Sequence, residues 1–459
     1  MDLLVFIKNN LNVNSPALGR MLSCLPFEYR PGVGKMYRER RKDIVRYEKL
    51  TTAERQAWIY KKCYDIVNYA AHRIPFYKDF YTRSRFSVNA LKTFDDIKRI
   101  PIINKEILQE YDIEDRAVRT RNRYVVNTGG SSGNPLAFYI PSSLIGNEWA
   151  HMHYIWEKLA YRQSDLKLTF GGRSDIGKAV IKYDALRHSY ALDIYQDYRA
   201  AASKLKEVLA KRRIKYLHGY PSAIYEFSLF CRDQDPELGK MLSATLKGAF
   251  LGSEYPMPLY RNTIEEVFGI PTISWYGHTE RCILAYEKTE PYTYSPFQTY
   301  GYVEAIEGGS DYACHRLIGT SYYNYVAPFI RYDTGDEVND VVHTSGILNH
   351  FKVQNGRSGQ FVVDRNGHKI PLTGLIFGRH HRLFDYCSHI QIAQQEPGKA
   401  FILYVPVTSE SIPFDAANMF DAGNVNIDFQ FRMMDAPVKT AAGKINLLVK
   451  CKDLVEMKQ

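Results

Sequence analysis

One stretch of the chain combines glycines with hydroxyl side chains at a density that suits phosphate binding. It runs from Thr128 to Pro135 with the sequence TGGSSGNP, between the apolar residues 124–126 and the apolar segment 136–140. Glycine lets successive backbone N–H groups turn toward one point, and serine and threonine hydroxyls add donors, so such a loop can surround phosphate oxygens. No Lys-Ser or Lys-Thr pair follows Gly133, and the spacing is not GxGxxG, so this is neither a Walker A loop nor a dinucleotide fingerprint. A glycine-rich hairpin turn between two strands is the structural alternative.

Four further polar segments follow along the chain. They read YGHTE at 276–280, RYDTGD at 331–336, GRS at 356–358 and KTAAGK at 439–444. Carboxylates in such segments can hold Mg²⁺ or accept hydrogen bonds from a diol, and a lysine can neutralise anionic groups. Taken singly each has a plain structural alternative: Asp336 fits a turn residue, Glu280 a helix cap and Lys444 an exposed lysine between strands.

In this order and at these separations, the five segments resemble the signature set of the adenylate-forming superfamily, which includes acyl- and aryl-CoA ligases, luciferases and the adenylation domains of peptide synthetases. Within it the chain is most similar to the phenylacetate–CoA ligase group, and there to the CapK-type proteins of capsular polysaccharide loci. The similarity is carried by RIPFYKDFY (73–81), IKRIPIINKEIL (97–108), HGYPSAIYEF (218–227), YGHTERCILAYE (276–287) and GRSGQFVVDRNGHKIPLTGLIFG (356–378). It covers the chain from about residue 35 onward.

The resemblance implies a role for each motif residue. Thr128, Gly129, Gly130, Ser131, Ser132 and Gly133 would bind the β- and γ-phosphates of ATP, and Gly252, Ser253 and Glu254 would lie against the adenine. Tyr276 would stack on the purine, Gly277 and His278 would pack at the substrate carboxylate, Thr279 would touch the α-phosphate and Glu280 would hold Mg²⁺. Asp336 and Arg357 would reach the ribose, and Lys444 would bridge the substrate carboxylate and the α-phosphate. The catalytic set is then Lys444, Glu280, Thr279 and His278, with Glu280 as the metal ligand.

The implied reaction converts ATP and a carboxylic acid into acyl-AMP and pyrophosphate, and then passes the acyl group to CoA or to an amine or hydroxyl of a sugar or amino acid. The resemblance places it in cell-surface polysaccharide biosynthesis. Carboxylate and ATP are both anions, so their approach needs Mg²⁺ and a cation such as Lys444, and positioning supplies much of the rate. Tyr220, Pro221, Trp275 and His278 are expected to line part of the acyl pocket.

Two positions depart from the family pattern and leave a second hypothesis open. Gln360 stands where the family's hinge has an acid, and Asn134 stands where many members have lysine. Both favour a non-catalytic, nucleotide-binding scaffold in polysaccharide assembly. A third hypothesis, a basic membrane-surface protein, depends on the apolar run Leu3–Ile7 and the basic cluster Tyr37–Lys42.

Composition limits the remaining classes. The 459 residues carry a net charge of +10, but most of the basic residues are scattered, and no nucleic-acid motif is present. Seven cysteines at irregular spacing, with no Cys-x-x-Cys pair, indicate free thiols in a reducing cytosol. The apolar run near the start is too short for a signal peptide core, and no run approaches 18 apolar residues. We therefore expect a cytoplasmic protein without a transmembrane segment, with attachment to the inner membrane face as a variant.

The elements expected around these motifs indicate an α/β fold. Short apolar runs near 122–128, 136–140, 167–171, 214–219, 247–252 and 271–276 predict strands, and residues 52–71, 201–212 and 221–232 predict amphipathic helices. In the first of these helices Trp58, Cys63, Ile66, Val67 and Ala70 are expected on the apolar face. Such alternation favours a largely parallel sheet. Beyond about residue 295, strand-like pieces including APFIRYD follow one another and predict a β-rich subdomain. The polar QNGRSGQ segment predicts a boundary between a large domain (1–355) and a small, mobile α+β domain (356–459), with helices near 378–387 and 412–421.

Overall fold

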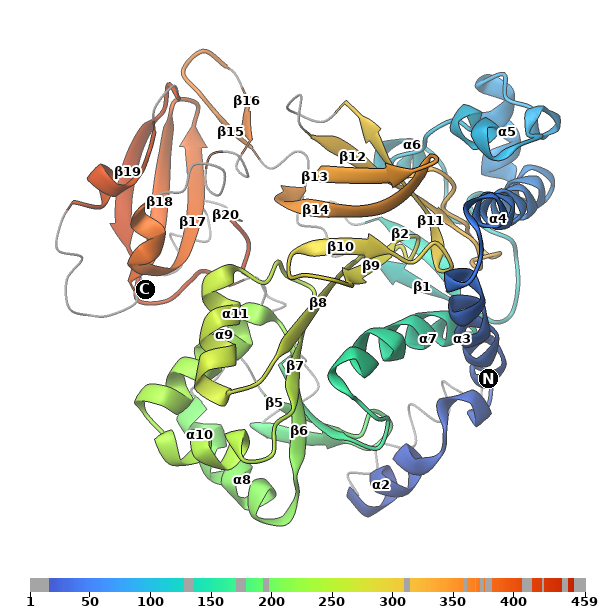
Figure 1. Cartoon of the computed structure of the whole chain (residues 1–459). Helices are drawn as coiled ribbons and strands as arrows, with labels where there is room; N and C mark the ends of the chain where they lie inside the picture. The colour runs from blue at the N-terminus through green and yellow to red at the C-terminus, as the bar shows by residue number, and fades with distance from the viewer. Residues whose placement is uncertain are drawn as a thin grey trace. The chain divides into compact units, whose positions relative to one another are not determined.

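The structure is a computed structural model of the whole chain (Figure 1). It describes residues 16–127, 136–170, 179–192, 198–308, 314–357, 361–367, 369–371, 375, 382–406, 415–422, 425–439 and 445–449. The chain divides into two compact units. The first comprises residues 1–307, 315–334 and 338–352, and the second comprises residues 308–314, 335–337 and 353–459.

Helices dominate the first third of the chain, and strands dominate the last third. The α-helices are α2 (Pro16–Cys24), α3 (Gly34–Glu48), α4 (Thr52–Arg73), α5 (Pro75–Arg83), α6 (Lys105–Gln109), α7 (Leu144–Trp156), α8 (Tyr198–Lys211), α9 (Pro221–Asp233), α10 (Pro236–Ser243) and α11 (Pro258–Phe268). The strands are β1 (Arg123–Asn127), β2 (Ala137–Pro141), β3 (Leu166–Phe170), β4 (Ile181–Asp184), β5 (Ser189–Leu192), β6 (Ile214–Gly219), β7 (Gly248–Leu251), β8 (Thr272–Gly277), β9 (Leu284–Glu287), β10 (Thr293–Pro296), β11 (Gly301–Glu307), β12 (His315–Ser321), β13 (Tyr332–Thr344), β14 (Ile347–Arg357), β15 (Phe361–Val363), β16 (Lys369–Pro371), β17 (Cys387–Glu396), β18 (Lys399–Pro406), β19 (Asp428–Met433) and β20 (Leu448–Val449).

A 12-stranded mixed sheet is the framework of the molecule. Its order is β11-β12-β13-β14-β10-β9-β8-β7-β6-β3-β5-β4. Strands β5, β3, β6, β7 and β8 are parallel, whereas β9 pairs with β8 in the antiparallel sense. The helices that connect the parallel strands supply the crossovers that parallel pairing requires. The predicted α/β class, with parallel strands followed by a β-rich region, is confirmed.

Both faces of the parallel strands are buried, and successive residues serve opposite faces. Leu217, Ala249 and Leu251 belong to one apolar cluster with residues of α8, α9, α10 and α11. Tyr216 and Phe250 belong to another cluster with α7, where the Phe250 ring stacks on Trp156 at a centroid distance of 4.6 Å. Figure 1 shows α8–α11 on one side of these strands and α7 on the other. This two-sided burial explains why the strands are continuous apolar runs in the sequence.

Residues 328–331 tie the N-terminal helices to the β-rich half. The Tyr77 hydroxyl donates to the Pro328 carbonyl at 2.7 Å and accepts from the Ile330 N–H at 3.2 Å. Arg331 donates from Nη1 to the carbonyls of Lys98 (2.6 Å) and Ile100 (2.7 Å), and its guanidinium pairs with Glu304, whose side chain is 11% exposed, at 3.0 Å. The first residue of the RYDTGD motif is therefore a structural cross-link.

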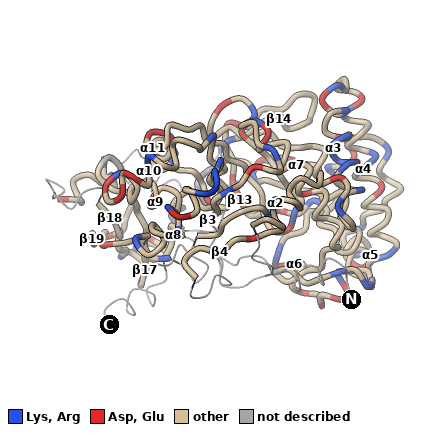
Figure 2. Tube along the Cα trace, turned by 90° about the horizontal axis from the view of Figure 1, so that it is seen from below, with Lys and Arg blue, Asp and Glu red and all other residues tan. Residues whose placement is uncertain are grey.

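The basic cluster at 37–42 lies on α3, and its best-buried members are already paired. Arg40 is 8% exposed, pairs with Asp43 at 2.7 Å and lies over the Tyr323 ring. Arg41 pairs with Glu157 at 2.7 Å. Basic and acidic residues lie side by side in this part of the chain (Figure 2). Among the described helices, none is both long and apolar enough to cross a bilayer.

The second unit is built on a four-stranded sheet of order β19-β18-β17-β20 beside the β15–β16 hairpin. Strands β17 and β18 are antiparallel, and β19 and β20 each join an edge in the parallel sense. Of the two predicted helices here, the described portions Arg382–Asp385 and Ala416–Met419 are single 3₁₀ turns. The described residues of these two predicted segments therefore form shorter helical turns than expected. They lack the sustained apolar stripe that an α-helix needs.

Two local expectations in the first unit were wrong. Ala327–Arg331 was expected to be a strand, but β13 begins only at Tyr332. The preceding residues bond to Tyr77 of α5, to the 98–100 segment and to the hydroxyls of Thr320 and Ser321 in β12 instead of forming a regular strand ladder. Trp58 was expected on the buried face of α4, where Ile59 stands instead. Its ring is half-buried between Arg46 and Lys62, whose cations lie over it.

Candidate active site

The carboxyl ends of four parallel strands meet at one edge of the sheet. The register pairs Phe170 with Gly219, Gly219 with Leu251, and Leu251 with Ser274. The segments that leave β6, β7 and β8 therefore emerge at the same edge. In open α/β sheets this is the edge where ligands bind. Two of the predicted site segments, 252–254 and 276–280, leave the sheet here.

The segment after β7 is fixed by backbone contacts. The Gly252 N–H donates to the Gly219 carbonyl at 3.1 Å, and a Cβ on Gly252 would lie 2.3 Å from the Trp275 ring. No side chain fits at this close approach, so glycine is required. Ser253 has φ of +71°, and Glu254 accepts from the Ser222 N–H in the first turn of α9 at 3.3 Å. A carboxylate is stabilised at a helix N-terminus, so Glu254 has a structural partner in addition to its predicted place beside adenine.

The YGHTE motif begins on β8 and turns back into β9. Tyr276 pairs with Ala285 and Gly277 with Leu284 across this hairpin. The Tyr276 ring is half-buried and lies edge-on to Phe351 of β14 at a centroid distance of 5.9 Å. Thr279 is half-buried as well. Arg281 at the turn has φ of +55°, a left-handed conformation that sends the chain back toward the sheet.

Glu280 lies at the centre of a buried polar chain. One carboxylate oxygen, Oε2, accepts from His278 Nδ1 at 2.9 Å, and the other, Oε1, accepts from the Tyr332 hydroxyl at 3.1 Å. The second ring nitrogen of His278, Nε2, lies 3.5 Å from Cys282 Sγ. Because Tyr332 belongs to the RYDTGD motif, these hydrogen bonds bring two of the sequence motifs into contact. Neither Tyr332 nor Cys282 was among the predicted site residues, although Tyr332 lies in the RYDTGD motif and Cys282 in the segment 276–287.

Burial affects the protonation of the His278 and Cys282 side chains in this set of contacts. Burial opposes a positive charge on His278, but the Cys282 sulfur and the Glu280 carboxylate outweigh it and raise the pKa of the imidazole above its usual value. Burial also raises the pKa of the Cys282 thiol. A carboxylate only accepts hydrogen bonds, so Nδ1 carries a proton whether the ring is neutral or charged. The imidazole therefore turns an N–H toward Glu280 in both states.

A buried ion pair stabilises the β8–β9 hairpin. Arg261 of α11 and Glu287 of β9 are 4% and 5% exposed at their side chains and approach to 2.8 Å. Glu287 also accepts from the backbone N–H groups of Ser274 (2.8 Å) and Tyr292 (2.7 Å). One carboxylate thus joins α11, β8 and the segment after β9, which fixes the strand that carries the motif.

Glu287→Gln is expected to lower the free energy of unfolding of the first unit by about 3–5 kcal/mol, because it leaves Arg261 buried without its counter-charge. Asp65→Asn, which breaks the exposed Lys61–Asp65 pair (3.0 Å), should cost less than about 1 kcal/mol. All four tryptophans (58, 149, 156 and 275) lie in the first unit, so urea unfolding followed by tryptophan fluorescence reports on it selectively. Equal losses in the two variants would contradict this role for Glu287.

Several predicted site residues lie elsewhere or outside the described residues. Thr128–Gly133 and Lys444 lie outside them, as do Asn134 and Gln360. The strands that flank the glycine-rich loop do pair as a hairpin, with Asn127 opposite Ala137. Asp336 is 8% exposed on β13, and Arg357 ends β14, where only its backbone is described. Both belong to the second unit, whereas Glu280 belongs to the first.

The donor set suits a magnesium ion that is shared with a nucleotide. Among the described residues, no group of three or more His, Cys, Asp or Glu side chains could hold a metal by itself. Mg²⁺ usually takes one or two carboxylates together with substrate phosphates and water. Both oxygens of Glu280 accept hydrogen bonds, from His278 and from Tyr332, and a carboxylate oxygen can accept more than one interaction. Glu280 therefore fits the single protein ligand that the motif predicted.

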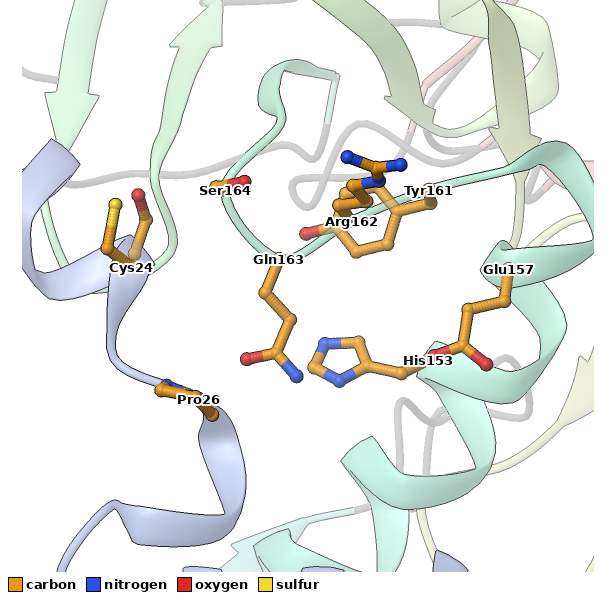
Figure 3. A pocket seen from close by; sticks show the side chains of 9 residues that line it. Cys24, Pro26, His153, Glu157, Tyr161, Arg162, Gln163 and Ser164 are labelled. Atoms are coloured by element: carbon orange, nitrogen blue, oxygen red, sulfur yellow. The ribbon is translucent and has the colours of Figure 1, made fainter.

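An open cavity of about 420 Å³ lies away from these motifs, between the α2 region and α7 (Figure 3). It is lined by Ser23, Cys24, Pro26, His153, Glu157, Tyr161, Arg162, Gln163 and Ser164, and includes none of the predicted site residues. Two of its lining side chains are bonded to residues outside the lining: Gln163 accepts from the Phe27 N–H (2.9 Å), and His153 bonds the Tyr37 hydroxyl (3.0 Å). The cavity is therefore separate from the candidate active site.

Sequence comparison gives one distant curated relative. No protein-family model matches the chain. Protein CapK of Staphylococcus aureus is 23% identical over 287 residues, which is 60% of this chain. The match spans 60% of CapK's own length, less than two thirds of it.

Structural comparison gives acid-activating ligases over nearly the whole chain. The 2-hydroxyisobutyryl-CoA ligase in its postadenylation state, in complex with R3-HIB-AMP, superposes with a TM-score of 0.66 at 16% identity over 90% of this chain and 93% of the ligase. The same ligase with 2-HIB-AMP and CoA, in the thioesterification state, gives 0.57 at 17% identity over 90% and 94%. GH3.15 acyl acid amido synthetase gives 0.60 at 12% identity over 87% and 93%. At such identities the likeness is one of fold. The chain therefore has the fold of the adenylate-forming ligases, and its resemblance to that superfamily, with a distant link to CapK, is confirmed.

Proposed function

We propose that the chain uses ATP to activate a carboxylic acid as acyl-AMP, with release of pyrophosphate. The observation that carries this proposal is the buried Glu280, held by His278 and Tyr332 at the carboxyl edge of the parallel strands. In a fold shared with ligases whose structures hold acyl-AMP intermediates, a carboxylate at this edge suits Mg²⁺ bound to ATP phosphates. Bound Mg²⁺ supplies charge compensation as pyrophosphate leaves.

The remaining roles follow the motif order. Thr128–Gly133 bind the β- and γ-phosphates, Gly252–Glu254 and Tyr276 hold the adenine, and Thr279 contacts the α-phosphate. Asp336 and Arg357 bind the ribose, Gly277 and His278 border the substrate carboxylate, and Lys444 bridges that carboxylate and the α-phosphate. These assignments are supported by the resemblance. Residues 1–355 and 356–459 would then form the large domain and the small domain that moves between half-reactions.

The acyl acceptor and the setting are finer parts of the same proposal. The structural neighbours include a CoA ligase and an acyl acid amido synthetase, so CoA and an amine are the two acceptor classes to test. The link to CapK supports a place in capsular polysaccharide biosynthesis, carried out in the cytoplasm or at the inner membrane face. The phenylacetate–CoA ligase group is the subfamily we propose.

ATP–pyrophosphate exchange tests the first half-reaction. The purified protein with Mg²⁺ should catalyse exchange with one class from a panel of aryl, fatty, amino and uronic acids. Exchange with one class would identify the substrate class along with the reaction. ATP binding without exchange for any acid would favour the nucleotide-binding scaffold, and an absence of ATP binding would contradict both hypotheses.

A further inference from the structure

Cys282 is held in place by two neighbouring strands. Its side chain is fully buried. A Cβ on Gly319 of β12 would lie 2.6 Å from Cys282 Sγ, and a Cβ on Gly301 of β11 would lie 2.2 Å from the Cys282 carbonyl oxygen. Both positions therefore need glycine to leave room for the cysteine. The sulfur is therefore packed closely against the backbone of β12 at Gly319.

The His278 ring connects this fixed sulfur to Glu280. Its two nitrogens are both engaged, Nε2 with Cys282 Sγ at 3.5 Å and Nδ1 with Glu280 Oε2 at 2.9 Å. The side chain is 5% exposed. An imidazole held at both nitrogens has one ring orientation, so the direction of its Nδ1–H is set by the sulfur behind it.

The Glu280 carboxylate is in turn held at both oxygens. Tyr332, 3% exposed, donates to Oε1, and His278 donates to Oε2. Two donors on the two oxygens fix the plane of the carboxylate. Metal affinity depends on the orientation in which a ligating carboxylate is held.

We propose that Cys282 is a positioning residue, which acts through His278 to hold the Glu280 carboxylate in the orientation that receives Mg²⁺. The inference rests on the proposed function, because it takes Glu280 as the metal ligand. It adds a residue that the motif pattern does not include. It also changes the role of His278, whose two ring nitrogens contact Glu280 and Cys282 and leave only its carbon edge for the substrate.

The test measures metal binding in the absence of turnover. Mn²⁺ is titrated into the protein with a non-hydrolysable ATP analogue and no acid, and free Mn²⁺ is followed by electron paramagnetic resonance. Cys282→Ala should weaken Mn²⁺ binding by about 10–100-fold, the range for partners that orient a metal ligand. Cys282→Ser keeps a donor for Nε2 and should restore part of the affinity. The affinity for the nucleotide without metal should change less than about twofold, because Cys282 is fully buried and presents no surface to a ligand.

Cys63→Ala is the matched control. Cys63 is also fully buried, on α4, so its substitution creates a cavity of the same kind without touching the His278 chain. It should bind Mn²⁺ as the unchanged protein does. Equal affinities in Cys282→Ala and Cys63→Ala would overturn the inference. Failure of the unchanged protein to bind Mn²⁺ with the analogue would instead contradict the proposed function.

A measurement on the unchanged, metal-free protein covers the case in which the Cys282 variants do not fold. Nitrogen-15 spectra of the histidine side chains, with His278 assigned by its loss in His278→Gln, should show an Nδ1 that carries a proton. A ring protonated at Nε2 alone would exclude the donation to Glu280 and overturn the inference.

Discussion

Glu280→Gln is expected to lower the rate of ATP–pyrophosphate exchange by about 10²–10³-fold, a loss typical of removing one group that stabilises charge in the transition state. Glutamine keeps the size of the side chain and an acceptor for Tyr332, but it removes the negative charge that attracts Mg²⁺. Binding of ATP without metal should change little. Initial rates of exchange across a range of Mg²⁺ concentrations measure the effect, and excess Mg²⁺ should recover part of it.

Tyr332→Phe is the matched control for this change. It removes one hydrogen bond to Glu280, at 3.1 Å, and leaves the charge in place. The exchange rate should fall by about 10-fold, the low end for a partner that orients a metal ligand, because the carboxylate keeps the charge that attracts Mg²⁺. If Glu280→Gln exchanged as fast as Tyr332→Phe, the carboxylate would not be the metal ligand.

Lys444→Ala is expected to reduce exchange by a similar factor, about 10²–10³-fold, because the substrate carboxylate and the α-phosphate would approach without a cation between them. The change should act on one half-reaction. Acyl transfer from synthetic acyl-AMP should proceed at a rate within about threefold of the unchanged protein, since no charge then needs to be neutralised at the α-phosphorus.

Lys439→Ala serves as the control for Lys444→Ala. Lys439 begins the same KTAAGK segment and forms a β-bridge with Ile445 through its backbone, which alanine preserves. Its exchange rate should stay near that of the unchanged protein. Equal losses in both variants would point to a disturbed turn, and a loss of transfer together with exchange would contradict the division of roles.

The sequence predicted the elements whose side chains repeat with a clear period. The strands β6, β7 and β8 were placed to within a residue or two because they are buried on both faces and read as unbroken apolar runs. Helices α8 and α9 were found from their amphipathic stripes. The prediction that Trp58 lies on the buried face of α4 was wrong. Its large ring is stable at the surface because the cations of Arg46 and Lys62 lie over it.

The site was predictable where residue type alone implies a role, and not where the role depends on a distant partner. Glu280 was predicted from its motif. Tyr332 and Cys282 have roles that depend on their contacts: Tyr332 bonds Glu280 across 52 residues of chain, and Cys282 contacts His278 in the turn of the hairpin. Arg331 is the first residue of the RYDTGD motif, yet its partners are Glu304 and the carbonyls of Lys98 and Ile100. Sequence order does not report such contacts.

The contacts of Arg331 have a consequence for synthesis of the protein. Its bond to the Ile100 carbonyl joins residues 231 positions apart, and the bond from Tyr77 to Pro328 spans 251. At a translation rate of about 5–20 residues per second, α4 and α5 leave the ribosome roughly 10–50 s before the segment that secures them exists. For that time the Tyr77 hydroxyl and the carbonyls of Lys98 and Ile100 lack these partners. The newly made N-terminal helices can therefore complete their hydrogen bonding only after residue 331 has been translated.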